Sequence, residues 1–209
     1  MRPTHENASD APAPLLVFTD LDATLLDDAY RWDAAQPALD ALKAMGVPVV
    51  LSSSKTLQEM MVIADELHTG APLIAENGGI IAIPADGTFP IPGNGLEREG
   101  AYAVTYTGLG RTELIAAAHG LRSREGYLFE GFSDWSVARV RRETGLSEAQ
   151  AAQSLQRFAT EPIRWMDTEA RWKSFKKALL EKGVRTVRGV RFIHLIGCID
   201  KDLGLKRVF

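Results

Sequence analysis

The chain has 209 residues, of which 45% are hydrophobic and 24% charged, and this is the composition of an ordinary globular protein with room for one large or two small domains. Its formal net charge of −3 provides no basic excess, so we expect neither nucleic acid nor an anionic membrane surface as a partner. No apolar run approaches the length of a membrane span, and the single cysteine rules out an internal disulfide and fits a reducing cytoplasm.

The two ends of the chain carry few structural signals. Residues 1–14 contain three prolines and no apolar core, so we expect a flexible tail rather than a signal peptide. The single cysteine, Cys198, is expected to be a small buried residue and not a nucleophile.

An acidic pair follows the first apolar run of the chain. Leu15, Leu16, Val17 and Phe18 predict a short buried strand, and Asp20 and Asp22 come directly after it. Residues two apart on an extended backbone point to the same side, so both carboxylates should face one spot at the carboxyl end of a strand, where open α/β sheets bind ligands. Two like charges held together need a cation or a shared proton. A bare Asp-x-Asp pair is also common in loops after an edge strand, so the pair alone assigns no site.

The segments up to residue 79 alternate between helix and strand. Two helices are expected, each opened by a capping-box spacing: Asp33 with Gln36, and Thr56 with Glu59. Two further apolar runs, 47–51 and 72–75, predict buried strands. Strand, helix, strand, helix, strand is typical of a parallel sheet with right-handed crossovers. Because each strand ends in polar residues, three polar clusters should meet along one edge of the sheet.

The rest of the chain predicts a second module. Ile80 to Ile83 should form a strand that pairs back after an Asn-Gly-Gly turn, and glycines and prolines indicate a linker over residues 84–100. The patterns beyond it predict strands at 102–106, 163–166 and 191–196, and helices at 112–119, 147–158 and 172–180, with Ala151, Leu155 and Phe158 facing inward. We expect a core over residues 15–87, an inserted α+β module over 88–196, and a return to the core over 197–209.

Two further polar groups are candidates for binding phosphate. Ser53 follows the second strand; it either caps the next helix or presents its hydroxyl to an anion at that helix N-terminus, and Ser52 is the alternative in register. Lys201 follows the last predicted strand; a lone lysine is normally a solvated surface group, but here it lies where the chain should re-enter the core.

These motifs resemble those of the haloacid dehalogenase (HAD) superfamily of phosphohydrolases. The run Asp20-Leu21-Asp22-Ala23-Thr24-Leu25-Leu26 resembles its first motif, with Ala23 where most members have glycine. Ser52-Ser53-Ser54-Lys55 resembles the second motif, with Ser53 at the hydroxyl position, and Asp200-Lys201 resembles the lysine motif of one family of these enzymes.

Within the superfamily, the chain is most similar to the mannosyl-3-phosphoglycerate phosphatases. The resemblance covers almost everything after the tail. Its further stretches are Leu73-Ile74-Ala75-Glu76-Asn77-Gly78-Gly79, Gly131-Phe132-Ser133-Asp134, Thr144-Gly145-Leu146-Ser147, Arg157-Phe158-Ala159-Thr160-Glu161-Pro162-Ile163 and Arg191-Phe192-Ile193-His194.

The resemblance implies a HAD-like Rossmannoid α/β core with an inserted α+β cap, and a magnesium-dependent phosphatase. Mannosyl-3-phosphoglycerate would be cleaved to mannosylglycerate and phosphate. Asp20 would be the nucleophile that forms an aspartyl-phosphate, and Asp22 the general acid and base. Mg²⁺ would be held by the Asp20 carboxylate and the Asp22 backbone carbonyl, while Ser53 and Lys201 would balance the charge of the phosphoryl group.

The resemblance also implies candidates for binding the substrate: Ser54, Lys55, Glu76, Asn77, Arg157 and His194. For Glu76 and Asn77 a plain turn with an exposed acid is an equal alternative. Arg157, Glu161 and His194 could equally be a structural ion pair and a strand histidine.

One motif of the superfamily has no counterpart. No Gly-Asp-x-x-Asn-Asp type loop follows Lys201, and the sequence stops eight residues later at Phe209. We therefore expect a C-terminally incomplete core, weak magnesium retention, slow or absent turnover and reduced solubility. The alternatives are a non-catalytic or truncated phosphosugar-binding protein, another sugar-phosphate phosphatase of the superfamily and, least favoured, a metal-dependent glycosyltransferase.

Overall fold

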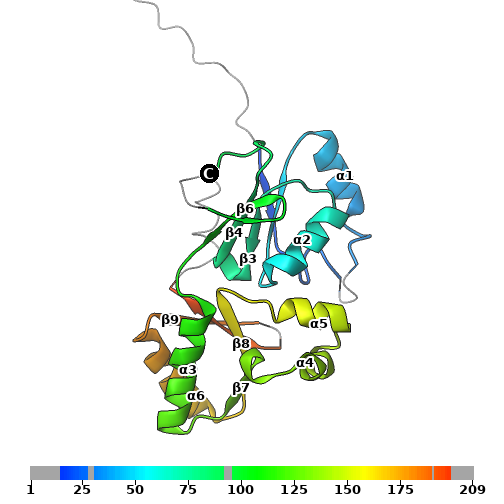
Figure 1. Ribbon diagram of the computed structural model, residues 1–209. Helices are drawn as coiled ribbons and strands as arrows, with labels where there is room; N and C mark the ends of the chain where they lie inside the picture. Colours follow the sequence, from blue (N-terminus) through cyan, green and yellow to red (C-terminus); the bar gives the residue numbers. More distant parts are fainter. Residues whose placement is uncertain (1–14, 28–30, 92–95, 190, 199–209) are drawn as a thin grey trace, which may run out of the picture.

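The computed structural model describes residues 15–27, 31–91, 96–189 and 191–198, which form two sheets flanked by helices (Figure 1). Lys201 and most of the expected return to the core lie outside the described residues. The first sheet contains, in spatial order, β1 (Val17–Thr19), β2 (Val49–Ser52), β3 (Leu73–Ala75), β4 (Ile80–Pro84), β6 (Tyr102–Tyr106) and β5 (Glu97–Glu99). The second contains β7 (Phe129–Gly131), β8 (Thr160–Trp165), β10 (Ile193–Gly197) and β9 (Val184–Arg188).

The predicted parallel sheet is confirmed for its first three strands. β1 pairs with β2 and β2 with β3 in parallel, in registers that place Phe18 opposite Val50 and Leu51 opposite Leu73. The crossovers are α1 (Gln36–Ala44) and α2 (Leu57–Glu66), and both contribute to one apolar cluster against the same face of the sheet. The carboxyl ends of the three strands consequently share one edge. β4 pairs antiparallel with β3, as expected after the Asn-Gly-Gly turn.

One of the two predicted capping boxes of these helices forms. At α2 the hydroxyl of Thr56 accepts from the backbone of Glu59, and the Glu59 carboxylate accepts from the backbone of Thr56. The Asp33–Gln36 box is wrong, because α1 begins only at Gln36, after Ala35, which has no side-chain cap. Pro37 explains the later start, since proline is favoured in the first turn of a helix.

The first sheet extends further along the chain than expected. β6 pairs antiparallel with β4, with Thr105 opposite Ile81, and β5 pairs with β6. The expected second module, beginning at residue 88, would contain both strands, whereas their partners lie in the first sheet. Alternation reveals a strand in the sequence but not the strand that it pairs with. We call the six-stranded sheet with α1 and α2 the first unit.

The second unit comprises the four-stranded sheet and the helices α3 to α6. All its strand pairs are antiparallel. Helices α3 (Arg111–Glu125) and α6 (Glu169–Leu180) bury Leu114 and Phe175 in one cluster with strand residues, while α4 (Val137–Thr144) and α5 (Glu148–Ser154) bury Val140 and Ala151 in another. The unit is an α+β arrangement, as the alternation of strands and helices predicted.

One helix of the predicted second module is shorter than expected, and the predicted burial of Cys198 is wrong. The helix expected over 147–158 ends at Ser154, and the Phe158 side chain is 45% exposed because the backbone has left the helix and runs toward β8. Cys198 is exposed rather than buried, since it follows the last residue of β10.

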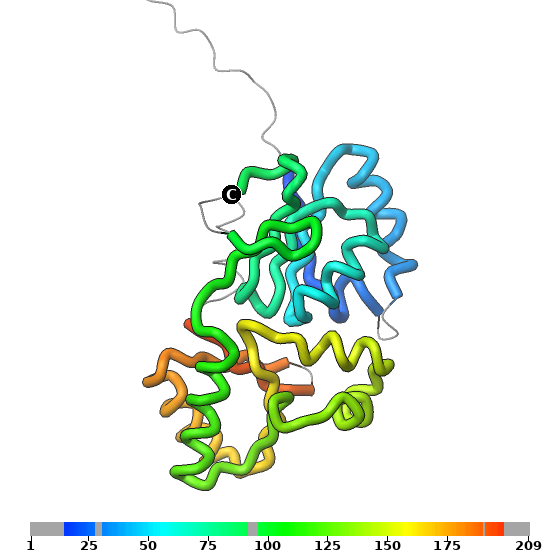
Figure 2. The backbone as a smooth tube through the Cα atoms, viewed as in Figure 1, coloured from blue at the N-terminus to red at the C-terminus, as the bar shows by residue number. Residues whose placement is uncertain are grey.

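The second unit lies against the edge where β1, β2 and β3 end (Figure 2). A contact between the units shows this directly, because the hydroxyl of Thr56, at the start of α2, donates to the backbone oxygen of Gln153 in α5 at 3.3 Å. The second unit therefore contacts the first at the edge where the parallel strands end.

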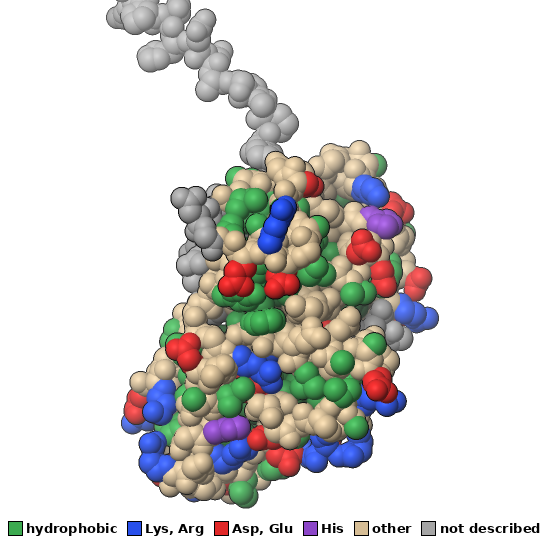
Figure 3. Space-filling model, in the orientation of Figure 1, with side chains coloured by type: hydrophobic (Ala, Val, Ile, Leu, Met, Phe, Trp, Pro, Cys, Tyr) green, Lys and Arg blue, Asp and Glu red, His purple; other side chains and the backbone are tan. Residues whose placement is uncertain are grey.

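Lys and Arg side chains gather on the second unit in the face shown in Figure 3. Many of its arginines are paired with acids; examples are Arg122 with Asp134 at 2.9 Å and Arg171 with Asp167 at 2.7 Å. This surface therefore carries both charges and is not a uniform basic patch. Among the described residues, no helix is both long and apolar enough to cross a membrane.

Candidate active site

The acidic pair lies in the loop that leaves β1. Asp20 and Asp22 are both exposed, and Leu21 between them is fully buried, which anchors the loop to the core. Asp20 Oδ1 accepts a hydrogen bond of 2.7 Å from the Leu21 backbone nitrogen. Asp22 Oδ1 lies 2.9 Å from Nζ of Lys55, a side chain that follows β2. The structure thus joins the first two polar clusters that the sequence placed at this edge.

The turn after the acidic pair is tightly wound. Ala23 has φ 57°, in the left-handed region, and the Leu26 backbone nitrogen donates back to the Leu21 oxygen at 2.8 Å. The turn sends Leu25 and Leu26 into the core. A left-handed backbone explains why glycine suits the position of Ala23.

Ser53 is fully buried at the end of β2 and is not the cap of α2, since that position belongs to Thr56. Its hydroxyl accepts from the Lys55 backbone nitrogen at 3.3 Å, and its backbone oxygen accepts from the Asn77 nitrogen at 3.0 Å. Ser52, the alternative in register, has a buried hydroxyl without a hydrogen-bond partner. The loop after β2 is therefore hydrogen-bonded to the loop after β3.

The loop after β3 is buried, and two of its residues have left-handed backbone conformations. Glu76 and Asn77 have φ 49° and 60°, and both side chains are buried, so the alternative of an exposed acid in a plain turn is wrong. The Glu76 backbone nitrogen donates to the Lys55 oxygen at 2.9 Å. Nδ2 of Asn77 is buried without a hydrogen-bond partner.

The Glu76 carboxylate is bound by the second unit. Its oxygens accept from the backbone nitrogens of Phe158 at 2.9 Å and Ala159 at 3.0 Å, and from the hydroxyl of Thr160 at 2.7 Å. The sequence placed Glu76 near the site, but no local pattern indicated these partners, which are more than 80 residues away.

Arg157 reaches from the second unit to the first. Its Nη1 donates to the Ser54 backbone oxygen at 3.0 Å and to the Thr160 hydroxyl at 2.9 Å, while its Nε is buried without a partner. His194, on β10, also has a buried nitrogen without a partner, Nδ1. Burial, with a smaller contribution from the nearby charge of Arg157, lowers the pKa of His194 from 6.5 to about 3. His194 is therefore neutral near pH 7.

Glu161 has a partner that the sequence did not reveal. Its carboxylate accepts from Nε of Arg111 at 2.8 Å and from the Ser133 backbone nitrogen at 2.7 Å. The ion pair of Glu161 is therefore with Arg111, at the start of α3, and the sequence offered no signal for Arg111. Gly131 makes room for this carboxylate, since a Cβ at that position would lie 2.5 Å from Glu161 Oε1.

The described residues contain no group of three or more His, Cys, Asp or Glu side chains placed to hold a metal ion. The Asp20 carboxylate and the Asp22 backbone carbonyl are oxygen donors of the kind that Mg²⁺ prefers, and magnesium sites often use only one or two carboxylates together with waters. The donor set therefore fits Mg²⁺ in chemistry, though not in number for a cage made of protein alone.

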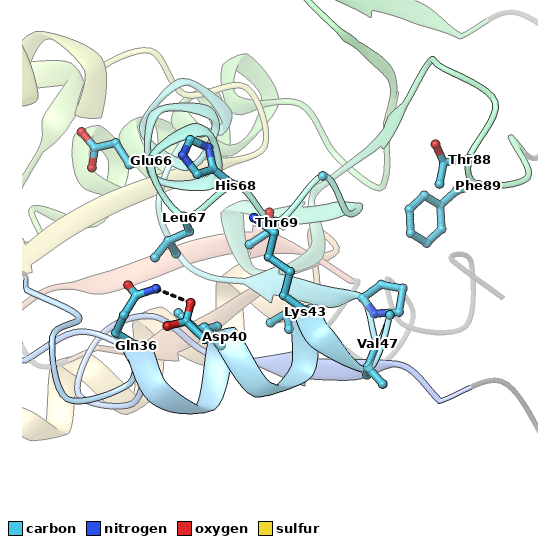
Figure 4. Close-up of a pocket in the computed structure, with 15 residues that line it drawn as sticks. Gln36, Asp40, Lys43, Val47, Glu66, Leu67, His68, Thr69, Thr88 and Phe89 are labelled. Carbon is cyan, nitrogen blue, oxygen red and sulfur yellow. Dashed lines mark hydrogen bonds between the residues drawn. The ribbon is translucent and has the colours of Figure 1, made fainter.

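One hollow of the described surface lies away from these residues. It measures about 390 Å³ and is lined by residues such as Lys43, Val47, His68 and Thr88, at the edge where β2 begins (Figure 4). None of the predicted site residues lines it. The edge where the strands end, which carries Asp20, Ser53 and Glu76, is the candidate active site on chemical grounds.

Comparisons with known proteins identify the family of the chain. The family described as haloacid dehalogenase-like hydrolase matches residues 17–99. A glucosyl-3-phosphoglycerate/mannosyl-3-phosphoglycerate phosphatase of Methanococcoides burtonii is 35% identical over 192 residues, a match that covers 91% of this chain and 70% of the relative.

Solved structures show the same fold. A haloacid dehalogenase-like hydrolase from B. subtilis superposes with a TM-score of 0.63 at 19% identity, covering 92% of this chain and 77% of that one. Protein 0175 of Thermoplasma acidophilum gives a TM-score of 0.62 at 14% identity, with coverage of 93% and 69%. The chain belongs to the haloacid dehalogenase-like hydrolases and, within them, to the family of phosphoric monoester hydrolases that includes the glucosyl-3-phosphoglycerate/mannosyl-3-phosphoglycerate phosphatases.

Proposed function

We propose that the chain hydrolyses mannosyl-3-phosphoglycerate to mannosylglycerate and phosphate. The observation that carries the proposal is the convergence of Asp20 and Asp22 with Lys55 at the end of β1 and β2, where Lys55 Nζ lies 2.9 Å from Asp22. The name of the M. burtonii relative supports the choice of substrate. A nucleophile, a proton donor and a cation in one loop cluster are what a phosphate monoester requires.

Asp20 attacks phosphorus through its carboxylate, and the bond between phosphorus and the glycerate oxygen breaks. Asp22 gives its proton to that leaving oxygen, so that the product leaves as an alcohol and Asp20 carries an aspartyl-phosphate. Asp22 then takes a proton from water, which attacks the same phosphorus and restores the Asp20 carboxylate as phosphate departs. Lys55 holds Asp22 through their ion pair and adds positive charge beside the phosphoryl group.

Asp20 and Asp22 are the residues that would hold Mg²⁺. When bound there, the ion would neutralise negative charge on the phosphate. The buried hydroxyl of Ser53 would contribute to binding the phosphoryl oxygens, as would Lys201, which lies outside the described residues.

Buried polar atoms without partners support the assignment of the substrate-binding residues. Three such atoms belong to predicted candidates: Nδ2 of Asn77, Nε of Arg157 and Nδ1 of His194. An unmade buried hydrogen bond is costly, and a ligand rich in hydroxyls with a carboxylate would satisfy such atoms. Arg157 is suited to a carboxylate and the neutral imidazole of His194 to a hydroxyl. Ser54 and Lys55 lie in the loop after β2, and the Ser54 backbone oxygen accepts from Arg157.

Trapping with beryllium fluoride, which mimics an aspartyl-phosphate, tests the nucleophile. In the presence of Mg²⁺ we expect density for the adduct on Asp20, and loss of phosphate release in Asp20→Asn but not in the matched exposed variant Asp33→Asn. An adduct on another residue, or ordinary turnover by Asp20→Asn, would contradict the assignment.

A second candidate function is binding of the phosphosugar without turnover. It is favoured by the lack of a third carboxylate ligand among the described residues. Calorimetry with mannosyl-3-phosphoglycerate beside a phosphate-release assay separates the two functions. Binding without release supports the second function, and release at ordinary enzymatic rates excludes it.

A further inference from the structure

The Glu76 side chain joins the two units through three hydrogen bonds. It has no exposed surface, and it accepts all three bonds from residues 158–160 of the second unit. Two of the donors are backbone nitrogens. A buried carboxylate is costly unless donors compensate it, so these bonds hold the segment tightly to the first unit.

The backbone of the same residue is tied to the candidate site. The Glu76 nitrogen donates to the Lys55 oxygen, and the nitrogen of the next residue, Asn77, donates to the Ser53 oxygen. Both Glu76 and Asn77 adopt left-handed backbone conformations, which L residues rarely hold without support from their surroundings. The backbone of Glu76 therefore binds the loop after β2, while its carboxylate binds the second unit.

The segment that Glu76 binds also carries Arg157. Arg157 lies next to Phe158 in the chain, and its Nη1 returns to the Ser54 oxygen at 3.0 Å. Contacts thus close a ring from Ser54 to Lys55, Glu76, the segment 158–160, Arg157 and back to Ser54.

We propose that Glu76 is a positioning residue that sets the place of Arg157, and hence of the substrate-binding side of the second unit, relative to the loop that receives the phosphate. It does not touch the substrate, because its oxygens are occupied by the second unit. It makes hydrolysis of a large substrate, which contacts both units, depend on a carboxylate outside the reacting centre. This inference rests on the phosphatase function proposed above, but its structural half can be tested without turnover.

The test compares Glu76→Gln with wild type on two substrates. Glutamine keeps the volume but replaces one acceptor oxygen with an NH₂ donor, so at least one of the three donors loses its acceptor. We expect kcat/KM for mannosyl-3-phosphoglycerate to fall by about tenfold or more, as for loss of a charge-assisted hydrogen bond. Hydrolysis of p-nitrophenyl phosphate, which is too small to need the second unit, should change by no more than about twofold. An equal loss on both substrates overturns the proposal.

Amide hydrogen exchange gives a reading that is independent of activity. The backbone amides of Phe158 and Ala159 should exchange slowly in wild type and faster in Glu76→Gln, while Glu181→Gln, an exposed acid of the second unit, should leave both unchanged. Unchanged exchange in Glu76→Gln overturns the proposal. If wild type releases phosphate from neither substrate, the proposed function fails, and exchange alone decides the role of Glu76.

Thr160→Val keeps the test decisive if Glu76→Gln does not fold. It removes one of the three donors, and we expect the same separation between the two substrates at smaller size. An equal loss on both substrates in Thr160→Val would overturn the proposal.

Discussion

The buried surroundings of Arg157 and His194 favour the positive charge on Arg157 but oppose a second positive charge on His194. Nε of Arg157 and Nδ1 of His194 are both buried and unpartnered, and the charge of Arg157 opposes a second positive charge on the imidazole. Protonating His194 in the folded state would thus place an uncompensated cation in the interior. The free-energy cost of protonating His194 in the folded state makes the stability of the protein depend on pH.

We expect His194 to make the protein less stable as the pH falls from about 6.5 toward 3. The folded pKa of His194 is lowered to about 3, so between these values the unfolded chain binds a proton that the folded chain does not. The free energy of unfolding therefore falls on acidification, by up to about 1.4 kcal/mol per pH unit from this residue. Urea unfolding at pH 7 and pH 5 measures the slope.

His194→Gln should reduce that slope, because glutamine does not titrate. The matched control is His68→Gln, whose parent side chain is exposed, and it should keep the wild-type slope. Identical slopes in wild type and His194→Gln would contradict the assignment.

Ala23 shows strain confined to one backbone position. Its φ of 57° costs an L residue roughly 1–2 kcal/mol, whereas glycine has no such cost but loses more entropy on folding, roughly 0.5–1 kcal/mol. Ala23→Gly should therefore raise the free energy of unfolding by about 0.5–1 kcal/mol. Ala41→Gly, on the exposed side of α1, should lower it by about 1 kcal/mol. A loss of stability in Ala23→Gly would contradict the strain that we assign to the left-handed backbone of Ala23.

Residue types predicted the candidate site better than they predicted its contacts. Asp20, Asp22 and Ser53 were placed at the ends of strands because a buried apolar run precedes each of them, and the structure has them there. The pairing of Lys55 with Asp22 depends on how two loops approach, and no spacing encodes that. The burial of Glu76 and the pairing of Glu161 with Arg111 depend on residues tens of positions away, so the sequence alone could not reveal them.

Among the elements, the start of α2 is held in place by hydrogen bonds of its N-cap residue, Thr56. The Thr56 hydroxyl accepts from the Glu59 backbone nitrogen, and its proton is shared between the Glu59 carboxylate at 2.8 Å and the Gln153 oxygen of α5 at 3.3 Å. This helix start is fully buried at Thr56 and follows directly on the loop of Ser53 and Lys55. The local spacing of Thr56 and Glu59 was sufficient to predict the cap, whereas the contact with α5 required the tertiary structure.

Removing the hydroxyl of Thr56 should therefore cost more than an ordinary cap. We expect Thr56→Ala to lower the free energy of unfolding by about 1–2 kcal/mol, at the upper end for N-caps, because two hydrogen bonds are lost. Ser147→Ala removes the cap of α5 at an exposed position and should cost about 1 kcal/mol or less. Thr56→Ser keeps the hydroxyl and serves as the control. Urea midpoints measure all three, and equal costs for Thr56→Ala and Ser147→Ala would contradict the added role.

At the scale of the whole molecule, the sequence predicted two units but not where one ends. Strand–helix alternation correctly indicated a parallel arrangement for β1 to β3 and an α+β arrangement for the later residues. It did not assign β5 and β6 to the first sheet, because their short alternating patterns fit either unit. Partner choice is settled by the buried face of β4, where Val104 of β6 lies opposite Ala82.

The metal site is a property of the whole molecule as well. The described residues supply the Asp20 carboxylate and the Asp22 backbone carbonyl from one loop, whereas Mg²⁺ prefers six oxygen ligands in near-octahedral geometry. We expect weak Mg²⁺ binding in calorimetry and slow phosphate release. Tight Mg²⁺ binding in calorimetry, or fast magnesium-dependent phosphate release, would contradict the expectation.

The separation of the two sheets along the chain also has a consequence during synthesis. All strands of the first sheet lie before Arg111 and all strands of the second sheet after it, so no described strand pair joins the two segments. A ribosome that adds about 5–20 residues per second exposes the first sheet for several seconds before β8 emerges. During that interval the Glu76 carboxylate faces water, and it becomes buried only when residues 158–160 arrive. The hydrogen bonds that join the second unit to the candidate active site therefore form only after the first sheet has been synthesised.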